Sequence, residues 1–377
     1  MYYLDNAATT KVLYEISSVV NNYNEHDFFN PSSVYLPAVR VKKDIDAIRD
    51  LILDKLSASD HKVLFLSSAT EANNIIFESV NLRPGDKILI SSVEHPAVYN
   101  KALSLKEKGI LVETIGCKNS GELDIDDLKS KLDKSVKLVS VMAVCNETGV
   151  IHDLKSISRV IKSFNKNILF AVDGVQAFGK IDLCIDDLDI DFFVLSGHKI
   201  HAPKGIGALV YRKNLHISPM LIGGGQENGL RSGTENVSGI MALGKATEIA
   251  FKNRKNNIEK VLFYKTKLID ALKLNIPGVV VNGDGVNVSP YILSVSIDNI
   301  RGEVLLHMLE KYEIYISTGS ACSSKHFDNR ILNAMGRSMN QVMGSIRISF
   351  NAYDELDIDF VCEKLINEIR DLQGKMN

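Results

Sequence analysis

The sequence lacks the features that mark several specialised classes of protein. Its five cysteines include no CxxC pair and their number is odd, which disfavours both a disulfide scaffold and a zinc ribbon. No apolar run approaches the roughly 18 residues that span a bilayer, and residues 1–6 lack the basic and apolar regions of a secretory signal. With a formal net charge of −2, the chain also lacks an electrostatic surface for nucleic acid or an anionic membrane. We therefore expect a cytoplasmic protein with reduced thiols.

The length of the chain and the order of its apolar segments indicate an α/β fold. Its 377 residues exceed an ordinary domain of about 100–200 residues, and its 45% hydrophobic and 24% charged residues are typical of a globular protein. Short, nearly continuous apolar runs predict strands covered on both faces at residues 63–66, 87–91, 111–115, 137–144, 168–172, 192–196 and 208–211. Amphipathic segments between them predict helices at residues 71–80, 97–108, 125–132 and 154–164. This alternation favours a mostly parallel sheet with helices on both sides.

The pattern changes after three consecutive glycines at residues 223–225. Two long helices are expected at residues 235–252 and 258–274. The rest of the chain predicts a smaller α+β unit, with strands near residues 291–297, 314–317 and 345–350 and helices near 302–311 and 355–373. We therefore expect a large domain at residues 13–255 and a small domain formed by residues 1–12 and 256–377.

Lys199 is the first candidate for chemistry. It follows the buried strand expected at residues 192–196, where an unpaired ammonium is costly. Such a lysine either reaches solvent or serves as a Schiff-base amine that condenses with an aldehyde. An enzyme that uses pyridoxal 5′-phosphate (PLP) in this way also needs a carboxylate for the pyridinium nitrogen, a phosphate site and a group that stacks on the ring.

Candidates for these three groups follow other expected strands. Asp173 ends one strand, residues 67–73 place small hydroxyl residues before a helix, and His95 follows a third strand. Each has an ordinary alternative, because Asp173 can be a helix N-cap, residues 67–71 a capping box and His95 a structural histidine. Their shared position at successive strand ends favours a common site.

Short motifs with a distinctive order occur along nearly the whole chain. They are, in order, Asp5-Asn6-Ala7-Ala8-Thr9-Thr10, Asn30-Pro31-Ser32-Ser33, Ala69-Thr70-Glu71, Glu94-His95, Asn146-Glu147, Asp173-Gly174-Val175-Gln176, Ser196-Gly197-His198-Lys199, Arg231-Ser232-Gly233-Thr234, Gly319-Ser320-Ala321-Cys322 and Ser345-Ile346-Arg347. These motifs resemble those of cysteine desulfurases of the NifS/IscS type, which belong to the class V aminotransferase group of fold-type I PLP enzymes.

The resemblance implies a fold-type I PLP-dependent transferase, with a mostly parallel seven-stranded sheet flanked by helices in the large domain and a smaller α+β domain. It implies that Lys199 bonds to the cofactor and moves the Cα proton, and that Cys322 accepts the sulfur. Asn146 and Arg347 are expected to bind the substrate carboxylate, a task that suits a bidentate guanidinium. The expected cofactor contacts are Asp173 at the pyridinium nitrogen, Gln176 at the phenolic oxygen, His95 on the ring, Ala69, Thr70, Ser196 and His198 around the phosphate, Asn146 beside the cofactor, and Thr234 at the phosphate of a neighbouring subunit. A homodimer follows from the last contact, and no metal is expected.

The neighbourhood of Cys322 independently favours its role as the reactive thiol. Residues 317–324 are small and polar, whereas a structural cysteine prefers apolar neighbours. Cys145, Cys184 and Cys362 lie among apolar residues and are expected to be packing groups, and Cys117 is expected to be exposed. The segment at residues 323–330 is expected to be mobile, which lets a persulfide move from the cofactor to an outside acceptor.

The resemblance implies conversion of L-cysteine to L-alanine, with a persulfide on Cys322 that is passed to a sulfur acceptor. An iron–sulfur scaffold and a tRNA-thiolation enzyme are both expected acceptors by analogy. A selenocysteine lyase, another class V lyase or aminotransferase, and a non-catalytic sulfur-relay scaffold are the alternatives. The sequence departs from the family's usual pattern at Tyr35, Pro37-Ala38, Ser68, Cys145, Asn228 and Asn351, which affects substrate entry, turn geometry and the partner surface rather than the core chemistry.

Overall fold

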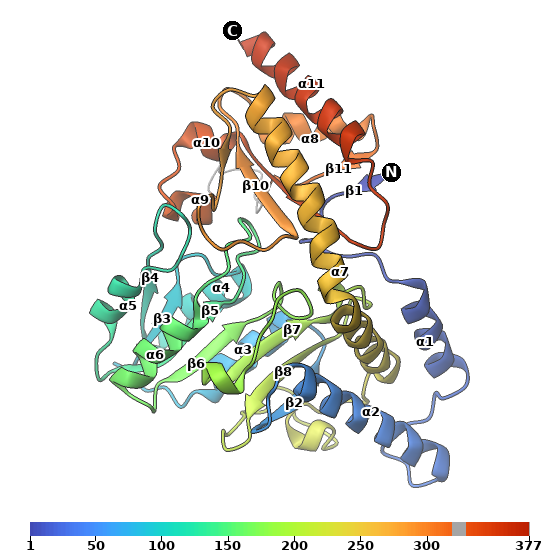
Figure 1. Cartoon of the computed structure of the whole chain (residues 1–377). Helices are drawn as coiled ribbons and strands as arrows, with labels where there is room; N and C mark the ends of the chain where they lie inside the picture. The colour runs from blue at the N-terminus through green and yellow to red at the C-terminus, as the bar shows by residue number, and fades with distance from the viewer. Residues whose placement is uncertain (319–328, 377) are drawn as a thin grey trace.

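The computed structural model describes residues 1–318 and 329–376 (Figure 1). The first part of the chain forms α1 (Tyr14–Glu25), α2 (Leu36–Lys55), β2 (His61–Leu66), α3 (Ala69–Ser79), β3 (Lys87–Ser91), α4 (Pro96–Ser104), β4 (Leu111–Ile115), α5 (Ile125–Lys131), β5 (Val136–Met142), α6 (Leu154–Phe164), β6 (Leu169–Asp173), β7 (Phe192–Ser196), β8 (Gly207–Arg212) and α7 (Val237–Asn275). The remaining elements are β1 (Tyr2–Tyr3), β9 (Val280–Val281), β10 (Ile292–Ser296), α8 (Gly302–Glu310), β11 (Ile314–Tyr315), α9 (Arg330–Ala334), α10 (Met339–Met343), β12 (Ser345–Ser349) and α11 (Ile358–Met376). None of the helices in these described ranges is long and apolar enough to cross a membrane.

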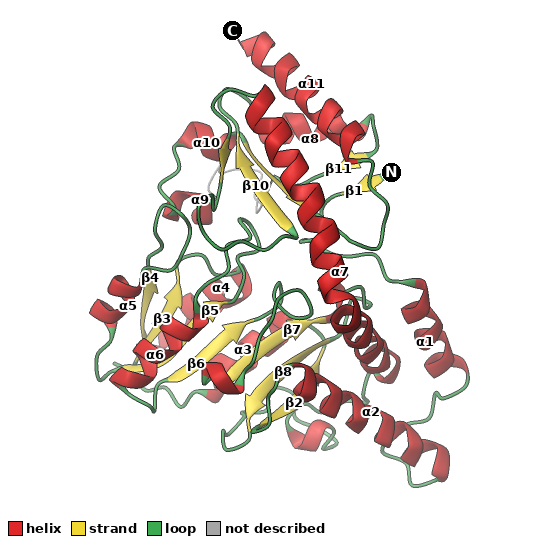
Figure 2. Ribbon diagram, viewed as in Figure 1, coloured by secondary structure: helices red, strands yellow, loops and turns green. Residues whose placement is uncertain are grey.

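A seven-stranded sheet in the order β2-β8-β7-β6-β5-β3-β4 forms the centre of the first part. Only β8 runs antiparallel to its neighbours, so the sheet is mostly parallel, as predicted. Helices lie on both faces (Figure 2), and the alternation of side chains along β7 shows why. Phe192 and Val194 pack in the core shared with α3 and α4, whereas Phe193 and Leu195 pack in the core shared with α2, α6 and α7. All seven predicted strands are present, within one or two residues of their expected ends.

The second part contains a three-stranded antiparallel sheet, β12-β10-β9, and a parallel pair, β1-β11. The N-terminal segment also bridges to β12 through Asp5 and Ser349. A separate apolar core joins these strands to α8, α11 and the later half of α7. The chain's first residues therefore pack against its last third.

The two long helices predicted at residues 235–252 and 258–274 are one helix, so that prediction was wrong. The 39-residue α7 runs without interruption through the polar residues 253–257, which resemble a linker in the sequence. These residues include neither proline nor glycine, and their polar side chains are half-buried or exposed on the helix. The expected domain boundary at residues 255/256 falls inside α7, between the residues of α7 that pack in the first core and those that pack in the second. The division into domains stays a prediction.

Helices α1 and α2 are elements that the sequence analysis did not anticipate. Both pack against α7, and α2 contributes a buried stripe at Val41, Ile45, Ile48 and Ile52. The helix expected at residues 97–108 is shorter, because α4 ends at Ser104 and a 3₁₀ turn follows at Leu105–Lys108.

Candidate active site

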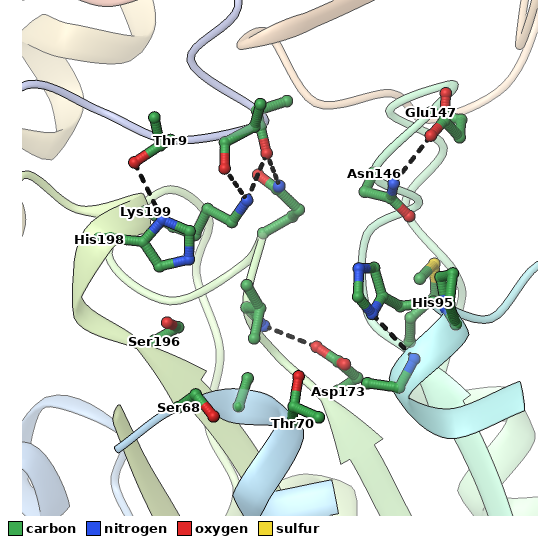
Figure 3. Close-up of a pocket in the computed structure, with 18 of the residues that line it drawn as sticks. Thr9, Ser68, Thr70, His95, Asn146, Glu147, Asp173, Ser196, His198 and Lys199 are labelled. Carbon is green, nitrogen blue, oxygen red and sulfur yellow. Dashed lines mark hydrogen bonds between the residues drawn. The ribbon is translucent and has the colours of Figure 1, made fainter. Parts of the chain in front are cut away.

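A cavity of about 980 Å³ lies where the strand ends of the large sheet meet the second part of the chain. Almost every predicted site residue lines it, and Figure 3 shows His95, Asp173, Lys199 and their neighbours around this space. The lining residues that were predicted from the sequence are Ala69, Thr70, His95, Asn146, Asp173, Gln176, Ser196, His198, Lys199 and Arg347. Thr234 does not line it, and Cys322 lies outside the described residues.

Lys199 ends a 3₁₀ turn, Gly197–Lys199, that follows β7 directly. Its Nζ donates to the carbonyl oxygens of Ala7 and Ala8, at 2.6 Å in each case (Figure 3). Burial, together with the positive charge of Arg347, lowers the pKa of Lys199 to about 8. A lysine with this pKa is free amine in about a tenth of the molecules at pH 7, far more than an ordinary lysine, and a nucleophile toward an aldehyde requires the free amine.

Asp173 is the last residue of β6 and is buried. Its Oδ2 accepts a hydrogen bond from Asn73 Nδ2 at 3.1 Å, and its Oδ1 accepts one from the Val175 N–H at 3.1 Å. Among the described residues no cation forms an ion pair with this carboxylate. A buried carboxylate held by neutral donors in this way is ready to meet a cationic partner, such as the pyridinium nitrogen of PLP.

His95 is the N-cap of α4, and this position fixes which nitrogen carries its proton. The Ala97 N–H donates to His95 Nδ1 at 3.1 Å, so the neutral ring holds its proton on Nε2. Burial lowers the pKa of His95, which keeps the imidazole neutral. A neutral, partly apolar ring suits a stacking contact, and its position in the cavity suits proton transfer.

The N-terminus of α3 supplies a site for an anion. Ser68 caps the helix by accepting from the Glu71 N–H at 3.2 Å, and Glu71 is held by Ser67 and by Arg231 Nε at 3.1 Å. Within the described structure no acceptor takes the N–H groups of Ala69 and Thr70. These two donors and the helix dipole fit the phosphate of PLP, so the capping and phosphate-site interpretations of residues 67–71 are compatible.

His198 lines the same cavity as this helix end. Its Nδ1 is 3.1 Å from Thr9 Oγ1, and burial, with the charges of Lys199 and Lys204, lowers the pKa of His198 to about 4. The ring is therefore neutral near pH 7 and can contact a phosphate only as a hydrogen-bonding group.

Arg347, on β12, brings a guanidinium to the same cavity. Its terminal nitrogens donate to Asp5 Oδ1 at 2.7 Å, Ser317 Oγ at 3.2 Å and the Asn146 carbonyl oxygen at 3.1 Å, and it lies 3.5 Å from Glu147 Oε1. Among the described atoms, Arg347 Nε and Asn146 Oδ1 are buried without a hydrogen-bond partner. Because buried polar groups are normally paired, this orphaned donor and acceptor fit a polar ligand such as an amino acid.

Thr234 lies apart from the other predicted contacts. It is exposed and lines a second cavity, of about 300 Å³, together with Ser67 and Gly205, which also border the main cavity. Its predicted role at a neighbouring subunit's phosphate stays a prediction.

Four of the five cysteines lie in the described residues. Cys145 and Cys362 are buried, Cys117 and Cys184 are half-buried, and none lines the main cavity. Cys117 is thus less exposed than predicted. Burial raises the pKa of Cys117, of Cys145 and, to about 11, of Cys362, which disfavours their reactive thiolate forms.

Three residues of the site region were missed by the sequence reasoning. Asn73 holds Asp173, Arg330 donates to the carbonyls of Ser92 and Glu94 beside His95, and Lys180 donates to Gln176. Of these three residues, only Lys180 could have been identified from a short-range sequence pattern, because it stands four residues after Gln176. The contacts of Asn73 and Arg330 span 100 residues or more and leave no short-range pattern.

Comparison with known proteins agrees with this geometry. The class V aminotransferase family model matches residues 2–359. A cysteine desulfurase of Trichormus azollae is 38% identical, with 100% of this chain and 95% of the relative aligned, and the cysteine desulfurase IscS of a Clostridium botulinum strain is 35% identical, with 98% and 95% aligned.

Solved structures give the same result. A NifS-like protein from Rickettsia africae superposes with a TM-score of 0.87 at 31% identity, covering 99% of both chains. A structure described as SspA in complex with cysteine superposes with a TM-score of 0.80 at 28% identity, covering 94% of this chain and 100% of that one. The chain therefore belongs to the class V aminotransferase family and, within it, to the cysteine desulfurases.

Proposed function

We propose that this PLP-dependent cysteine desulfurase converts L-cysteine to L-alanine and retains the sulfur as a persulfide on Cys322. The observation that carries the proposal is the convergence of Lys199, Asp173, His95 and Arg347 on one cavity. In the overall step, the Cβ–S bond of cysteine breaks, a hydrogen takes the place of the thiol on Cβ, and the released sulfur forms an S–S bond with Cys322 as Cys–S–SH. Atoms and electrons balance without an added oxidant or reductant.

The bound cofactor supplies an electron-withdrawing ring that makes the Cα proton and the Cβ–S bond of the substrate labile. The proposed tasks of the protein are to hold this ring and to move protons around it. Asp173 keeps the ring nitrogen protonated, and the N–H groups of Ala69 and Thr70 bind the phosphate together with Ser196 and His198. Neutral His95 packs on the ring face.

Lys199 is the proposed acid–base group at the substrate Cα. Its pKa of about 8 lies close to working pH, so the amine can accept a proton and return it. His95, with its proton on Nε2, is proposed to assist transfer at the sulfur end of the substrate.

Arg347 and Asn146 are proposed to bind the substrate carboxylate. The unpaired Nε of Arg347 supplies a donor on this side of the cavity. The Asp5 and Glu147 carboxylates beside the guanidinium hold it in place.

A homodimer is proposed as the working form. Thr234 is exposed on the single chain beside the second cavity, and Met220, Leu221 and Ile222 are exposed apolar residues of the preceding segment, which contacts the Thr234 region through the Leu221–Arg231 bridge. A second copy of the chain would cover this apolar segment and bring Thr234 to its neighbour's phosphate.

The sulfur acceptor is proposed to be a protein, either an iron–sulfur scaffold or a tRNA-thiolation enzyme, and the location is proposed to be the cytoplasm. The family resemblance supports both proposals. Adding either class of acceptor to the persulfide form and following the ³⁵S label distinguishes the two.

The assignment of the sulfur to Cys322 is tested by mapping the persulfide after one turnover. Cys322→Ser should retain bound cofactor and form no protein persulfide, whereas the control Cys117→Ser should form it at the wild-type level. Alkylation followed by peptide mass spectrometry locates the extra sulfur. Persulfide that persists on Cys117 in the Cys322→Ser variant, at the wild-type rate, would reject the assignment.

A further inference from the structure

Lys180 is a buried lysine that the proposed reaction does not use. The residue is about as buried as Lys87 and Lys265, at 9%, 8% and 5% relative exposure. Lys87 forms ion pairs with Glu113 and Asp133. For Lys180, the described residues supply no carboxylate partner, and its one hydrogen bond is to Gln176 Oε1, at 3.0 Å. An ammonium buried without a counter-charge is costly. Lys265 meets this cost by donating to the Ser289 carbonyl away from the main cavity, whereas Lys180 donates to a residue that lines the cavity.

The contacts of Gln176 determine which way its amide points. The oxygen and nitrogen of a glutamine amide look alike in shape, so the neighbours decide the orientation. Lys180 can only donate when it is charged, which requires Oε1 on its side, and the Ala7 carbonyl can only accept, which requires Nε2 on the other side, at 2.9 Å. A flipped amide would point its N–H groups at the Lys180 ammonium, where donor would face donor. It would also point its oxygen at the Ala7 carbonyl, where acceptor would face acceptor.

This orientation directs the Gln176 N–H toward Lys199. Gln176 Nε2 and Lys199 Nζ donate to the same oxygen, that of Ala7, at 2.9 and 2.6 Å, so the two nitrogens are neighbours. In PLP the phenolic oxygen is attached to the ring carbon next to the one that bears the aldehyde. A cofactor bonded to Lys199 would therefore place that oxygen beside Gln176, where an N–H donor stabilises its anionic form and a carbonyl oxygen would repel it.

We propose that Lys180 is a positioning residue that holds the Gln176 amide with its N–H toward the phenolic oxygen of the cofactor. The inference rests on the proposed function, because it assumes that PLP bonds to Lys199. Burial lowers the pKa of Lys180 to about 7, and an anionic phenolic oxygen beyond Gln176 favours its charged form. The ring of Tyr291, with its centroid 5.7 Å from Nζ, adds a further favourable contact for the cation.

The test follows the bound cofactor's absorbance as a function of pH in four proteins: wild type, Lys180→Met, Gln176→Leu and the double variant. Losing the donor destabilises the deprotonated cofactor, so Lys180→Met should raise the midpoint of the absorbance change by about one pH unit. In the Gln176→Leu background the same substitution should shift it by less than about 0.3 units. An equal shift of the midpoint in both backgrounds would mean that Lys180 acts by its charge alone, and this result would overturn the proposal. A midpoint that does not shift in Lys180→Met would also overturn it.

Two further variants separate positioning from folding. Lys265→Met removes another buried ammonium, one that donates to the Ser289 carbonyl at 2.8 Å outside the main cavity, and should leave the midpoint unchanged. Lys180→Arg keeps a donor-only side chain beside a small cavity of about 30 Å³ and should retain the wild-type midpoint. If Lys180→Met does not fold, a shifted midpoint in Lys180→Arg would overturn the proposal.

Failure of the proposed function is recognised separately. In that case wild-type protein would show no absorbance that depends on Lys199, whatever residue occupies position 180.

Discussion

The surroundings of Lys199 act on its pKa in opposite directions. It lies in a mostly buried site, where a charge is costly, and its hydrogen bonds are to the two backbone carbonyls of Ala7 and Ala8. The carboxylates of Asp5, Asp173 and Glu147 favour the ammonium, but burial and Arg347 have the larger effect, so the pKa of Lys199 falls to about 8. The result is an amine that is available near neutral pH and still able to carry a proton.

Cofactor loading should therefore depend on pH with a midpoint near 8. Only the free amine condenses with an aldehyde, and its fraction rises about tenfold between pH 7 and pH 9 and then levels off. Stopped-flow absorbance of apoprotein mixed with PLP measures this rate. A lysine of ordinary pKa would give a rate that still climbs several-fold between pH 9 and pH 10, and that profile would contradict the lowered pKa of Lys199.

At the residue scale, the sequence predicted the groups that end strands. Asp173 ends β6, and Lys199 and His95 lie within four residues of the ends of β7 and β3, so strand prediction places all three at one edge of the sheet. It did not predict Asn73 or Arg330, whose roles depend on how a helix is rotated and how distant segments meet. The capping contacts of Ser68 and His95 show that the ordinary interpretation of a motif and its functional interpretation can both hold.

Helix α7 is the element that links the two apolar cores. Ile240, Leu243 and Ala246 pack in the core beneath the large sheet, and Val261, Leu268 and Leu272 pack in the core of the second part. Its early residues also contact α1 and α2. The sequence predicts two helices here because the run of polar residues at 253–257 lacks the apolar periodicity that marks a helix. The observed helix continues because nothing in that run breaks it.

A break in α7 at residues 253–257 should weaken the whole protein. Asn256→Pro removes one backbone hydrogen bond and introduces a clash in the preceding turn, at a cost of about 3 kcal/mol in the free energy of unfolding. Asn256→Ala, at the same exposed position, should be neutral or slightly stabilising. Denaturant unfolding followed by circular dichroism measures both variants. Equal stability of the two would show that the junction is not helical in solution.

At the scale of the whole molecule, the cavity needs both parts of the chain. The large sheet supplies Lys199, Asp173 and His95, while Asp5, Ser317 and Arg347 come from segments that pair with one another in the second part. Sequence reasoning reached this architecture because the strand and helix order is regular. It did not reach the packing of α1 and α2 against α7, since nothing local in those segments specifies their partner.

The proposed dimer predicts a specific effect at Ile222, whose side chain is 89% exposed. Ile222→Asp would place a charge in the buried interface and should weaken self-association by at least about 100-fold. Cofactor affinity should fall in parallel, because Thr234 would no longer reach the phosphate in its neighbour's site. Leu274→Asp changes an equally exposed leucine, at 85%, near the far end of α7 and should have no effect (Figure 1). Sedimentation velocity and PLP titration measure the two quantities. A wild-type monomer that binds PLP tightly would reject the dimer.

We propose that one cavity, built around Lys199, releases sulfur from L-cysteine. The most direct measurement is L-alanine formed per L-cysteine consumed, followed by amino-acid analysis with a thiol reductant present, in wild type and in Lys199→Ala. One alanine per cysteine is expected in the wild type. Lys199→Ala should lose at least about 10³-fold in rate, because both the bond to the cofactor and the acid–base group are removed. Alanine production that continues at the wild-type rate in Lys199→Ala would contradict this proposal.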